Sequence, residues 1–209
     1  MNRSNVTRRG RGLAIWTAVA VLWLASAPAS AQQDSLFSLF QPTIEDVAPG
    51  VDHGNSAARL PEDFQRQTVF YRSQHPAGTI IVETSERHLY LIESETRALR
   101  YGIGVGRDGF TWAGLLQITR KTEWPDWRPP PEMIERQPYL PRFMAGGPGN
   151  PLGARAMYLG NTVYRIHGTN APETIGHAVS SGCFRLVNDD VADLYERVPV
   201  GTRVIVRQN

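Results

Sequence analysis

The sequence predicts a mostly β domain with few helices. Three short runs rich in Ile, Val, Leu and Tyr lie between residues 78 and 106, and the polar turn residues between them are typical of antiparallel hairpins. Apolar residues recur in "AMYLGNTVYRIHG", and "TRVIVRQ" predicts a last strand. Only "NDDVADLYERVPVG" shows a clear helical period.

The first 31 residues have the layout of a secretory signal peptide. Four arginines precede an apolar run from Leu13 to about Ala27, and the small residues "ASA" precede Gln32. The run is shorter than the roughly 20 residues of a spanning helix, and an uncleaved anchor is the alternative. We therefore expect an exported, periplasmic protein with no stable membrane insertion after signal cleavage.

The charge balance argues against a nucleic-acid partner. The chain has 22 basic and 20 acidic side chains, and the leader holds four of the basic ones and no acid. Its removal leaves 18 basic against 20 acidic side chains, a net charge of −2. A near-neutral domain lacks the basic footprint of nucleic-acid binding.

Residues 32–70 are predicted to be a linker or weakly structured segment. Pro, Gly, Asp and Ser interrupt its apolar pattern, and one weak helix is expected near residues 61–70. Residues 71–209 have the length of one ordinary domain. The sequence leaves open whether the linker docks on that domain.

A segment rich in Pro and Gly, residues 122–156, interrupts the strand pattern. Proline lacks a ladder donor, so this segment is not a central strand. Its aromatic residues, which include Trp124 and Trp127, instead predict an ordered loop that lines or caps a cleft. Core packing is the alternative for each of these tryptophans and for Trp112.

Two local features are predicted in detail. Gly160-Asn161 is expected to form a two-residue hairpin turn. Asn188 or Asp189 is expected to cap the helix of residues 188–198, which Pro199 ends.

Cys183 is the only cysteine in the 209 residues, so the chain cannot form an internal disulfide. In an exported protein such a residue is an intermolecular linker, a buried apolar side chain or a reactive thiol. A reactive thiol needs a cationic or basic neighbour, which is usually a histidine.

The histidines differ in how well they could serve that thiol. They are His53, His75, His88, His167 and His177. The first two lie in the linker or at its edge, and the third lies inside a strand. His167 ends a predicted strand and Cys183 follows Gly182, so the two could converge at one sheet edge. His177 lies in the intervening loop and is expected to be a solvated bystander.

The backbone next to the thiol suggests a second catalytic feature, an oxyanion-binding site. The N–H groups of Ser181, Gly182 and Cys183 could point at a carbonyl oxygen as an oxyanion hole. Zinc held by His167, His177 and Cys183 is a competing interpretation. Because no paired ligand spacing and no fourth ligand are apparent, we expect no metal and no cofactor.

The segment "IHGTNAPETIGHAVSSGCFRL" resembles the catalytic segment of the L,D-transpeptidase family of the YkuD/ErfK type. The family pattern is His-Gly, a spacer, Ser/Thr-x-Gly-Cys, an apolar residue, and Arg or Asn. Here it runs from His167-Gly168 to Cys183 and Arg185, with Ser181 where the family often has His. The resemblance extends over about residues 78–206.

The resemblance implies a β-sandwich of mixed sheets with a few short helices, and an exported enzyme that acts on peptidoglycan without a metal. Cys183 would attack the third residue of a stem tetrapeptide and form a thioester. His167 would act as the base, oriented by the backbone carbonyl near Gly168. A second stem peptide would then give a 3-3 cross-link, or a Lys of an outer-membrane protein would become anchored.

Alternatives to this interpretation share the same residues. Arg185 lies two positions after Cys183 and so on the same strand face, where it would hold a substrate carboxylate or form an ion pair. An L,D-carboxypeptidase would use water in place of the amine. A non-catalytic peptidoglycan-binding module would keep the fold alone.

Overall fold

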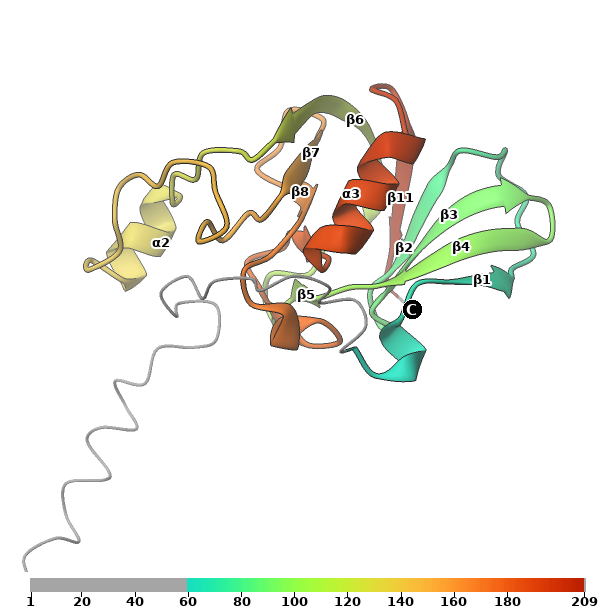
Figure 1. Cartoon of the computed structure of the whole chain (residues 1–209), viewed down its shortest axis with the longest axis horizontal. Coiled ribbons are helices and arrows are strands. Elements are labelled where there is room, and N and C mark those ends of the chain that lie inside the picture. Colours follow the sequence, from blue (N-terminus) through green and yellow to red (C-terminus); the bar gives the residue numbers. More distant parts are fainter. Residues whose placement is uncertain (1–59, 209) are drawn as a thin grey trace, which may run out of the picture. The chain divides into compact units, whose positions relative to one another are not determined.

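The computed structural model describes residues 60–208, whose strands form a nine-stranded sheet and a separate two-stranded sheet (Figure 1). The strands are β1 (Gln67–Phe70), β2 (Ile80–Glu83), β3 (His88–Ser94), β4 (Arg97–Gly102), β5 (Val105–Gly106), β6 (Gly114–Glu123), β7 (Arg155–Leu159), β8 (Arg165–His167), β9 (Ala178–Ser180), β10 (Phe184–Arg185) and β11 (Arg203–Arg207). The helices are α2 (Pro131–Arg136) and α3 (Asn188–Arg197), with 3-10 turns η4 (Glu62–Phe64) and η5 (Pro172–Thr174). The predicted mostly β class with few helices is confirmed. Within these residues no helix is long and apolar enough to cross a membrane.

The large sheet is mixed, with strand order β1-β4-β3-β2-β11-β6-β7-β8-β10. The β2–β11 and β8–β10 pairs are parallel, and the other pairs of this sheet are antiparallel. β6 joins the two halves, because its first residues pair with β11 and its later residues pair with β7. Figure 1 shows β6 arching between them. The sequence did not predict β6, because its polar and apolar residues do not alternate cleanly.

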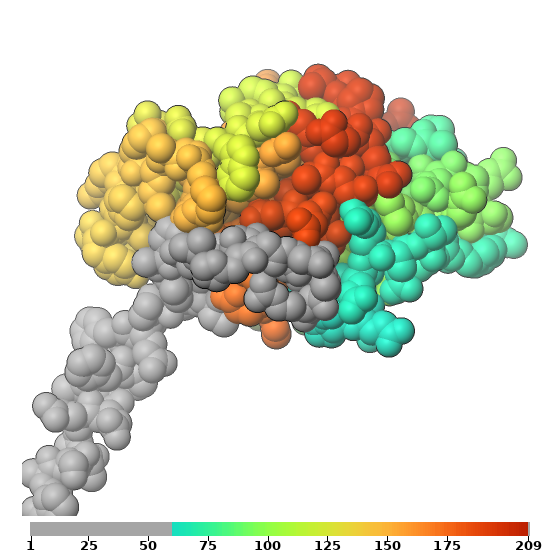
Figure 2. Space-filling model, in the orientation of Figure 1, coloured from blue at the N-terminus to red at the C-terminus, as the bar shows by residue number. Residues whose placement is uncertain are grey.

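One hydrophobic core unites both halves of the sheet with α3. Its buried residues include Val82, Leu89 and Tyr101 from the first half, Met157 and Phe184 from the second, and Val191 and Leu194 from α3. Figure 2 shows α3 and β11 between the segment around α2 and the β1–β4 strands on this face. Each large apolar side chain buried in this way contributes roughly 1.5–3 kcal/mol. The same core therefore supports β8 and the edge strand β10.

Residues 67–70 belong to the sheet, which corrects the predicted linker boundary, and the helix expected near residues 61–70 does not form. Only the three-residue turn η4 forms there, and β1 then pairs with β4. Leu60 is buried, and Phe64 packs so closely on Gly102 that a Cβ added there would lie 2.6 Å from the Phe64 Cβ. β1 is mostly exposed, so it carries no apolar alternation from which to predict it. Residues 32–59 lie outside the described residues.

The connection between β7 and β8 also differs from the prediction. It spans residues 160–164, so Gly160-Asn161 is not a two-residue turn. The Thr162 hydroxyl donates to the Leu159 carbonyl and accepts the N–H of Tyr164, which stabilises the longer loop. The hairpin itself was predicted correctly.

The α3 cap was predicted wrongly, because Val187 is the N-cap residue and no side chain caps the helix. Asn188 instead accepts the N–H of Ala154 through its side-chain oxygen at 2.8 Å. The side chain that was expected to serve its own helix therefore fixes the chain just before β7.

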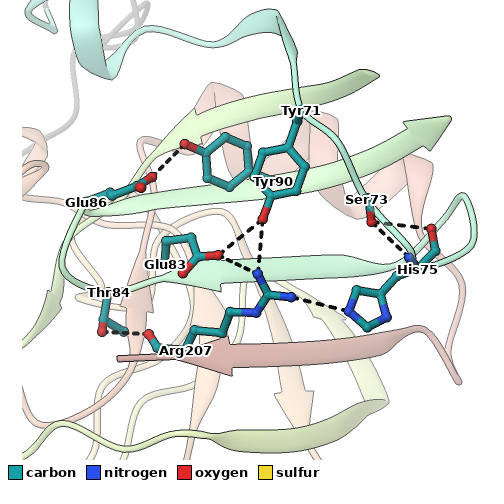
Figure 3. Close-up of polar contacts among 8 residues, drawn as sticks. All are labelled: Tyr71, Ser73, His75, Glu83, Thr84, Glu86, Tyr90 and Arg207. Carbon is teal, nitrogen blue, oxygen red and sulfur yellow. Dashed lines mark hydrogen bonds and ion pairs between the residues drawn. The ribbon is translucent and has the colours of Figure 1, made fainter. Parts of the chain in front are cut away.

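A polar cluster fastens residues 71–75 to the ends of β2 and β11 (Figure 3). The Glu83 side chain is only 6% exposed, and it accepts hydrogen bonds from Arg207 at 2.9 Å and from the Tyr71 hydroxyl at 3.1 Å. Arg207 also lies 3.3 Å from His75 Nε2. The Tyr71 ring packs 4.5 Å from that of Tyr90. A buried carboxylate needs such partners, so this cluster stabilises the N-terminal edge of the domain.

Replacing Arg207 by Met should destabilise the domain by about 1–2 kcal/mol, because Glu83 would lose its charged partner while staying buried. The value is reduced because Arg207 is itself 38% exposed. Urea unfolding measures the effect, with Arg203→Met as the control, since Arg203 is exposed on the same strand. Equal losses in both variants would show that the Glu83 pair adds no stability.

Candidate active site

The candidate site lies on one face of β8 and of the edge strand β10. These strands pair in parallel, with Phe184 opposite Ile166 and Arg185 opposite His167. Phe184 and Ile166 point into the core. Because side chains alternate along a strand, His167 and Arg185 point to the opposite face. Cys183, directly before β10, lines the same pocket.

The pocket on this face is lined by cationic, polar and apolar side chains. Its polar lining comprises Arg165, His167, Ser180, Ser181, Cys183 and Arg185. Its apolar lining comprises Trp127, Pro130, Met133, Pro151, Leu152 and Val163. No acidic side chain from residues 60–208 lines it, so this lining favours an anionic or partly anionic ligand.

The loop before Cys183 is held by Ser180. The Ser180 hydroxyl donates to the Cys183 carbonyl at 2.6 Å and accepts the N–H of Gly182 at 3.2 Å. The Cys183 thiol is partly exposed and lies 3.8 Å from the Val163 carbonyl. The nucleophile candidate is therefore fixed through its backbone while its sulfur reaches the pocket.

Gly182 has a conformation and a setting that only glycine fits. Its φ is +102°, and a Cβ there would lie 2.6 Å from Cε1 of Tyr164. Trp112 donates its indole N–H to the Gly182 carbonyl at 2.9 Å and stacks on Tyr164 at 4.5 Å. Trp112 thus packs against the core and supports the Cys183 loop from that side. This agrees with the core-packing alternative that was predicted for it.

The oxyanion-hole prediction meets one specific obstacle. The Gly182 N–H already donates to Ser180, so it would have to leave that bond to bind an oxyanion. The parts assigned to the Ser181 and Cys183 amides stay predictions.

His167 is held at the base of the pocket by its own following residue. Its side chain is buried, and its Nδ1 lies 2.6 Å from the Gly168 carbonyl, the contact that the family resemblance implied. A carbonyl can only accept, so Nδ1 carries the proton and Nε2 keeps its lone pair. A Cβ on Gly168 would lie 2.3 Å from the Asn188 side-chain oxygen, which explains the glycine.

Burial, followed by the positive charge of Arg185, lowers the pKa of His167 from 6.5 to about 3. The Gly168 carbonyl acts in the opposite direction, and Arg165 adds a smaller lowering. The imidazole is therefore neutral at pH 7 and ready to accept a proton. A resting imidazolium beside the thiol is disfavoured.

The other histidines of residues 60–208 do not line this pocket. His177 is exposed and does not line the pocket, as expected of a bystander. His88 is buried against Phe64, with Nε2 2.9 Å from the Asp63 carbonyl. His53 lies outside the described residues. Among residues 60–208, no group of three or more His, Cys, Asp or Glu side chains is arranged to hold a metal ion.

The Pro-rich segment is an ordered wall of the pocket, as predicted. Trp127 pairs with Met144 through two backbone hydrogen bonds of 2.8 and 2.9 Å, and α2 follows within the loop they close. Trp127 and Met133 line the pocket, whereas Trp124 is 42% exposed and lies outside its lining. The short helix α2 was not predicted.

Arg165 is the pocket residue that the sequence interpretation missed. It precedes His167 by two positions, so it lies on the same strand face. The alternation in "YRIHG" is the signal that could have identified it.

Comparison with known families decides the relationship. Residues 77–206 match the model of the L,D-transpeptidase catalytic domain, YkuD. The chain belongs to the L,D-transpeptidase family. The family membership that the sequence motif predicted is therefore confirmed.

Relatives and solved structures agree with this assignment. The chain is 42% identical over 134 residues to the probable L,D-transpeptidase ErfK/SrfK of Escherichia coli K12, and 37% identical over 170 residues to the probable L,D-transpeptidase YbiS of the same strain. These alignments cover 60% and 75% of this chain, but 42% and 52% of the relatives. The chain thus spans about half the length of these curated relatives.

The fold is also similar to that of L,D-transpeptidase 3 from Mycobacterium tuberculosis. The TM-score is 0.52 at 14% identity, covering 62% of this chain and 60% of the solved one. At that identity the likeness supports the fold alone.

Replacing Gly182 by Ala should displace the Cys183 loop, because the new Cβ meets Tyr164. We expect a stability loss of about 1–3 kcal/mol and at least roughly tenfold slower alkylation of Cys183 by iodoacetamide. The control is Gly109→Ala, where φ is +82° but nothing lies within 4 Å. If both variants lose the same stability and reactivity, the contact with Tyr164 is unimportant.

His167 should stay neutral from pH 8 down to about pH 5, because its pKa is lowered well below 6.5. The unfolded chain binds the extra proton first, so this group's contribution to stability falls as the pH drops from about 6.5 towards 3. NMR titration of the His167 ring measures the pKa directly. Arg185→Gln should raise it, and a wild-type midpoint near 6.5 would contradict the burial argument.

Proposed function

We propose that this domain is a cysteine-dependent L,D-transpeptidase of exported peptidoglycan metabolism. The observation that carries the proposal is the meeting of Cys183 and His167 in one pocket of a family-matched domain. The signal-like leader of residues 1–31 supports action outside the cytoplasm, in the periplasm. The chain spans only about half the length of its curated relatives. The substrates of this domain are therefore proposed here and are not taken from those relatives.

In the proposed first step the thiol of Cys183 attacks the carbonyl carbon of the third stem residue. The thiol proton passes to Nε2 of His167, and the S–C bond forms as the carbonyl oxygen gains negative charge. The tetrahedral intermediate then collapses, and the C–N bond to the terminal D-alanine breaks. His167 returns the proton to the departing amine, which leaves a thioester on Cys183.

The second step resolves that thioester by attack of an amine. The acceptor's proton passes to His167, the new amide forms, and the released thiolate of Cys183 recovers a proton from the imidazolium. A second stem peptide yields a 3-3 cross-link, and a Lys of an outer-membrane protein yields an anchored protein. Water as acceptor is the L,D-carboxypeptidase outcome.

The neutral state of His167 supports this order of events. A buried imidazole with a lowered pKa holds a proton only while the negative charge on the sulfur or oxyanion is close. Proton transfer is therefore coupled to attack on the substrate. This coupling limits reaction of the thiol in the absence of substrate.

Substitution of the two central residues tests the proposal. With tetrapeptide muropeptides as substrate, Cys183→Ala should abolish product, and His167→Ala should reduce the rate by about 10²–10⁴-fold. His177→Ala is the matched control and should stay within about twofold of wild type. A comparable loss in His177→Ala would show that the base had been assigned wrongly.

Product analysis distinguishes the acceptors and the non-catalytic alternative. Dimers linked 3-3 support transfer, whereas tripeptide monomers alone support hydrolysis. Mass spectrometry after incubation with a carbapenem should show one adduct on Cys183. Absence of any adduct or product from the folded wild-type protein would leave only a binding module.

A further inference from the structure

The outer face of the second half-sheet carries a row of residues that ends at the nucleophile candidate. Arg120 pairs in register with Tyr158, and Tyr158 with Arg165. Because Phe184 is opposite Ile166, the next position of this row is Cys183. Arg165 is thus the neighbour of Cys183 across the β8–β10 pair, and both line the pocket.

Arg165 is held in place without using its N–H donors. Its guanidinium carbon lies 5.3 Å from the centre of the Tyr158 ring, and that of Arg120 lies 3.6 Å from the same ring. An aromatic face attracts a cation through its π electrons, so it orients the guanidinium plane without accepting its hydrogen bonds in the way a carboxylate would. The donors of Arg165 remain available to a ligand.

One of these donors is both buried and unsatisfied. The Nε of Arg165 has no hydrogen-bond partner among residues 60–208, although it is shielded from solvent. The Nε atoms of Arg100 and Arg155 are in the same state, so this atom alone does not distinguish Arg165, and the Nη groups are the donors that concern a ligand. Because Nε is shielded, a carboxylate would be bound end-on by the two Nη groups, which together form a fork that matches its two oxygens.

Within the described part of the chain, the pocket lining around Arg165 supplies no acidic partner. The described pocket lining contains two arginines and no Asp or Glu. A ligand carboxylate would therefore enter a cationic site walled by apolar side chains such as Val163 and Leu152. Exclusion of water by these walls would strengthen the interaction.

We propose that Arg165 is a specificity residue whose guanidinium fork binds a carboxylate of the donor peptide beside Cys183. The proposal rests on the proposed function, because it names the chemistry by which this pocket selects its donor. The carboxylate belongs either to the side chain of the third stem residue or to the C-terminal D-alanine. Arg185 sits one row further along the same face, opposite His167.

The test compares three tetrapeptide donors that differ in one group: both carboxylates present, the third-residue side chain amidated, or the C-terminus amidated. For wild type, one amidation should lower kcat/KM by roughly 10- to 100-fold, mainly through KM. The amidated donor whose kcat/KM falls identifies the carboxylate that Arg165 binds. Arg165→Gln should lose most of that discrimination, and Arg165→Lys should recover only part of it.

The control variant is Arg203→Gln, which removes an exposed arginine from β11, away from the pocket. It should keep the wild-type discrimination. If Arg165→Gln keeps that discrimination too, or slows all three donors equally, Arg165 only packs on Tyr158 and the proposal is overturned.

Alkylation of Cys183 tests the site without relying on transpeptidase activity. Iodoacetate and iodoacetamide both form a thioether and release iodide, but only iodoacetate carries a carboxylate. The ratio of their rates cancels any change in thiolate population, since both reagents use the same nucleophile. Arg165→Gln should lower the iodoacetate-to-iodoacetamide ratio about tenfold relative to wild type and Arg203→Gln.

An unchanged ratio in Arg165→Gln would overturn the carboxylate site even if the enzyme is active. A lowered ratio with no turnover of any donor would support the site while the proposed function fails. Urea unfolding of Arg165→Gln, expected near wild type because the side chain is half-buried, verifies that the variant is folded.

Discussion

The parallel register of β8 and β10 is the constraint on which the site depends. It sends Ile166 and Phe184 into the core and therefore turns their neighbours outward together. A slip by one residue would turn His167 and Arg185 towards the hydrophobic core and the apolar pair towards the pocket. The free energy that drives core burial thus also sets the geometry of the pocket.

The glycines around the pocket extend this constraint to the backbone. Gly182 allows the chain to pass beneath Tyr164, and Gly168 leaves room for Asn188 beside the His167 carbonyl contact. Asn188 in turn fixes the chain before β7 through Ala154. The start of α3, the base of the Pro-rich wall and the histidine are therefore one connected arrangement.

The chemistry-bearing motif could be predicted from the sequence, because it is local. Cys183 and His167 lie in short glycine-flanked stretches whose spacing is itself informative. Features that depend on pairing between distant residues were missed or wrong. Arg165 lies next to Cys183 only because β10 pairs with β8, which the sequence does not reveal. β1 has no apolar alternation because it is an exposed edge strand. Asn188 was misassigned because its partner, Ala154, is remote in sequence.

The position of β11 has a consequence for how the domain folds. It is the last described strand, yet it lies between β2 and β6 and so joins the two halves of the large sheet. Until residues 203–207 are available, Ile80 and Leu116 lack their shared neighbour Val204. The complete large sheet therefore requires these pairings, which span long chain separations and are typically slow to form. Because Val204 and Val206 of β11 belong to the core that also holds Ile166 and Phe184, the thiol pocket depends on a strand that does not line it.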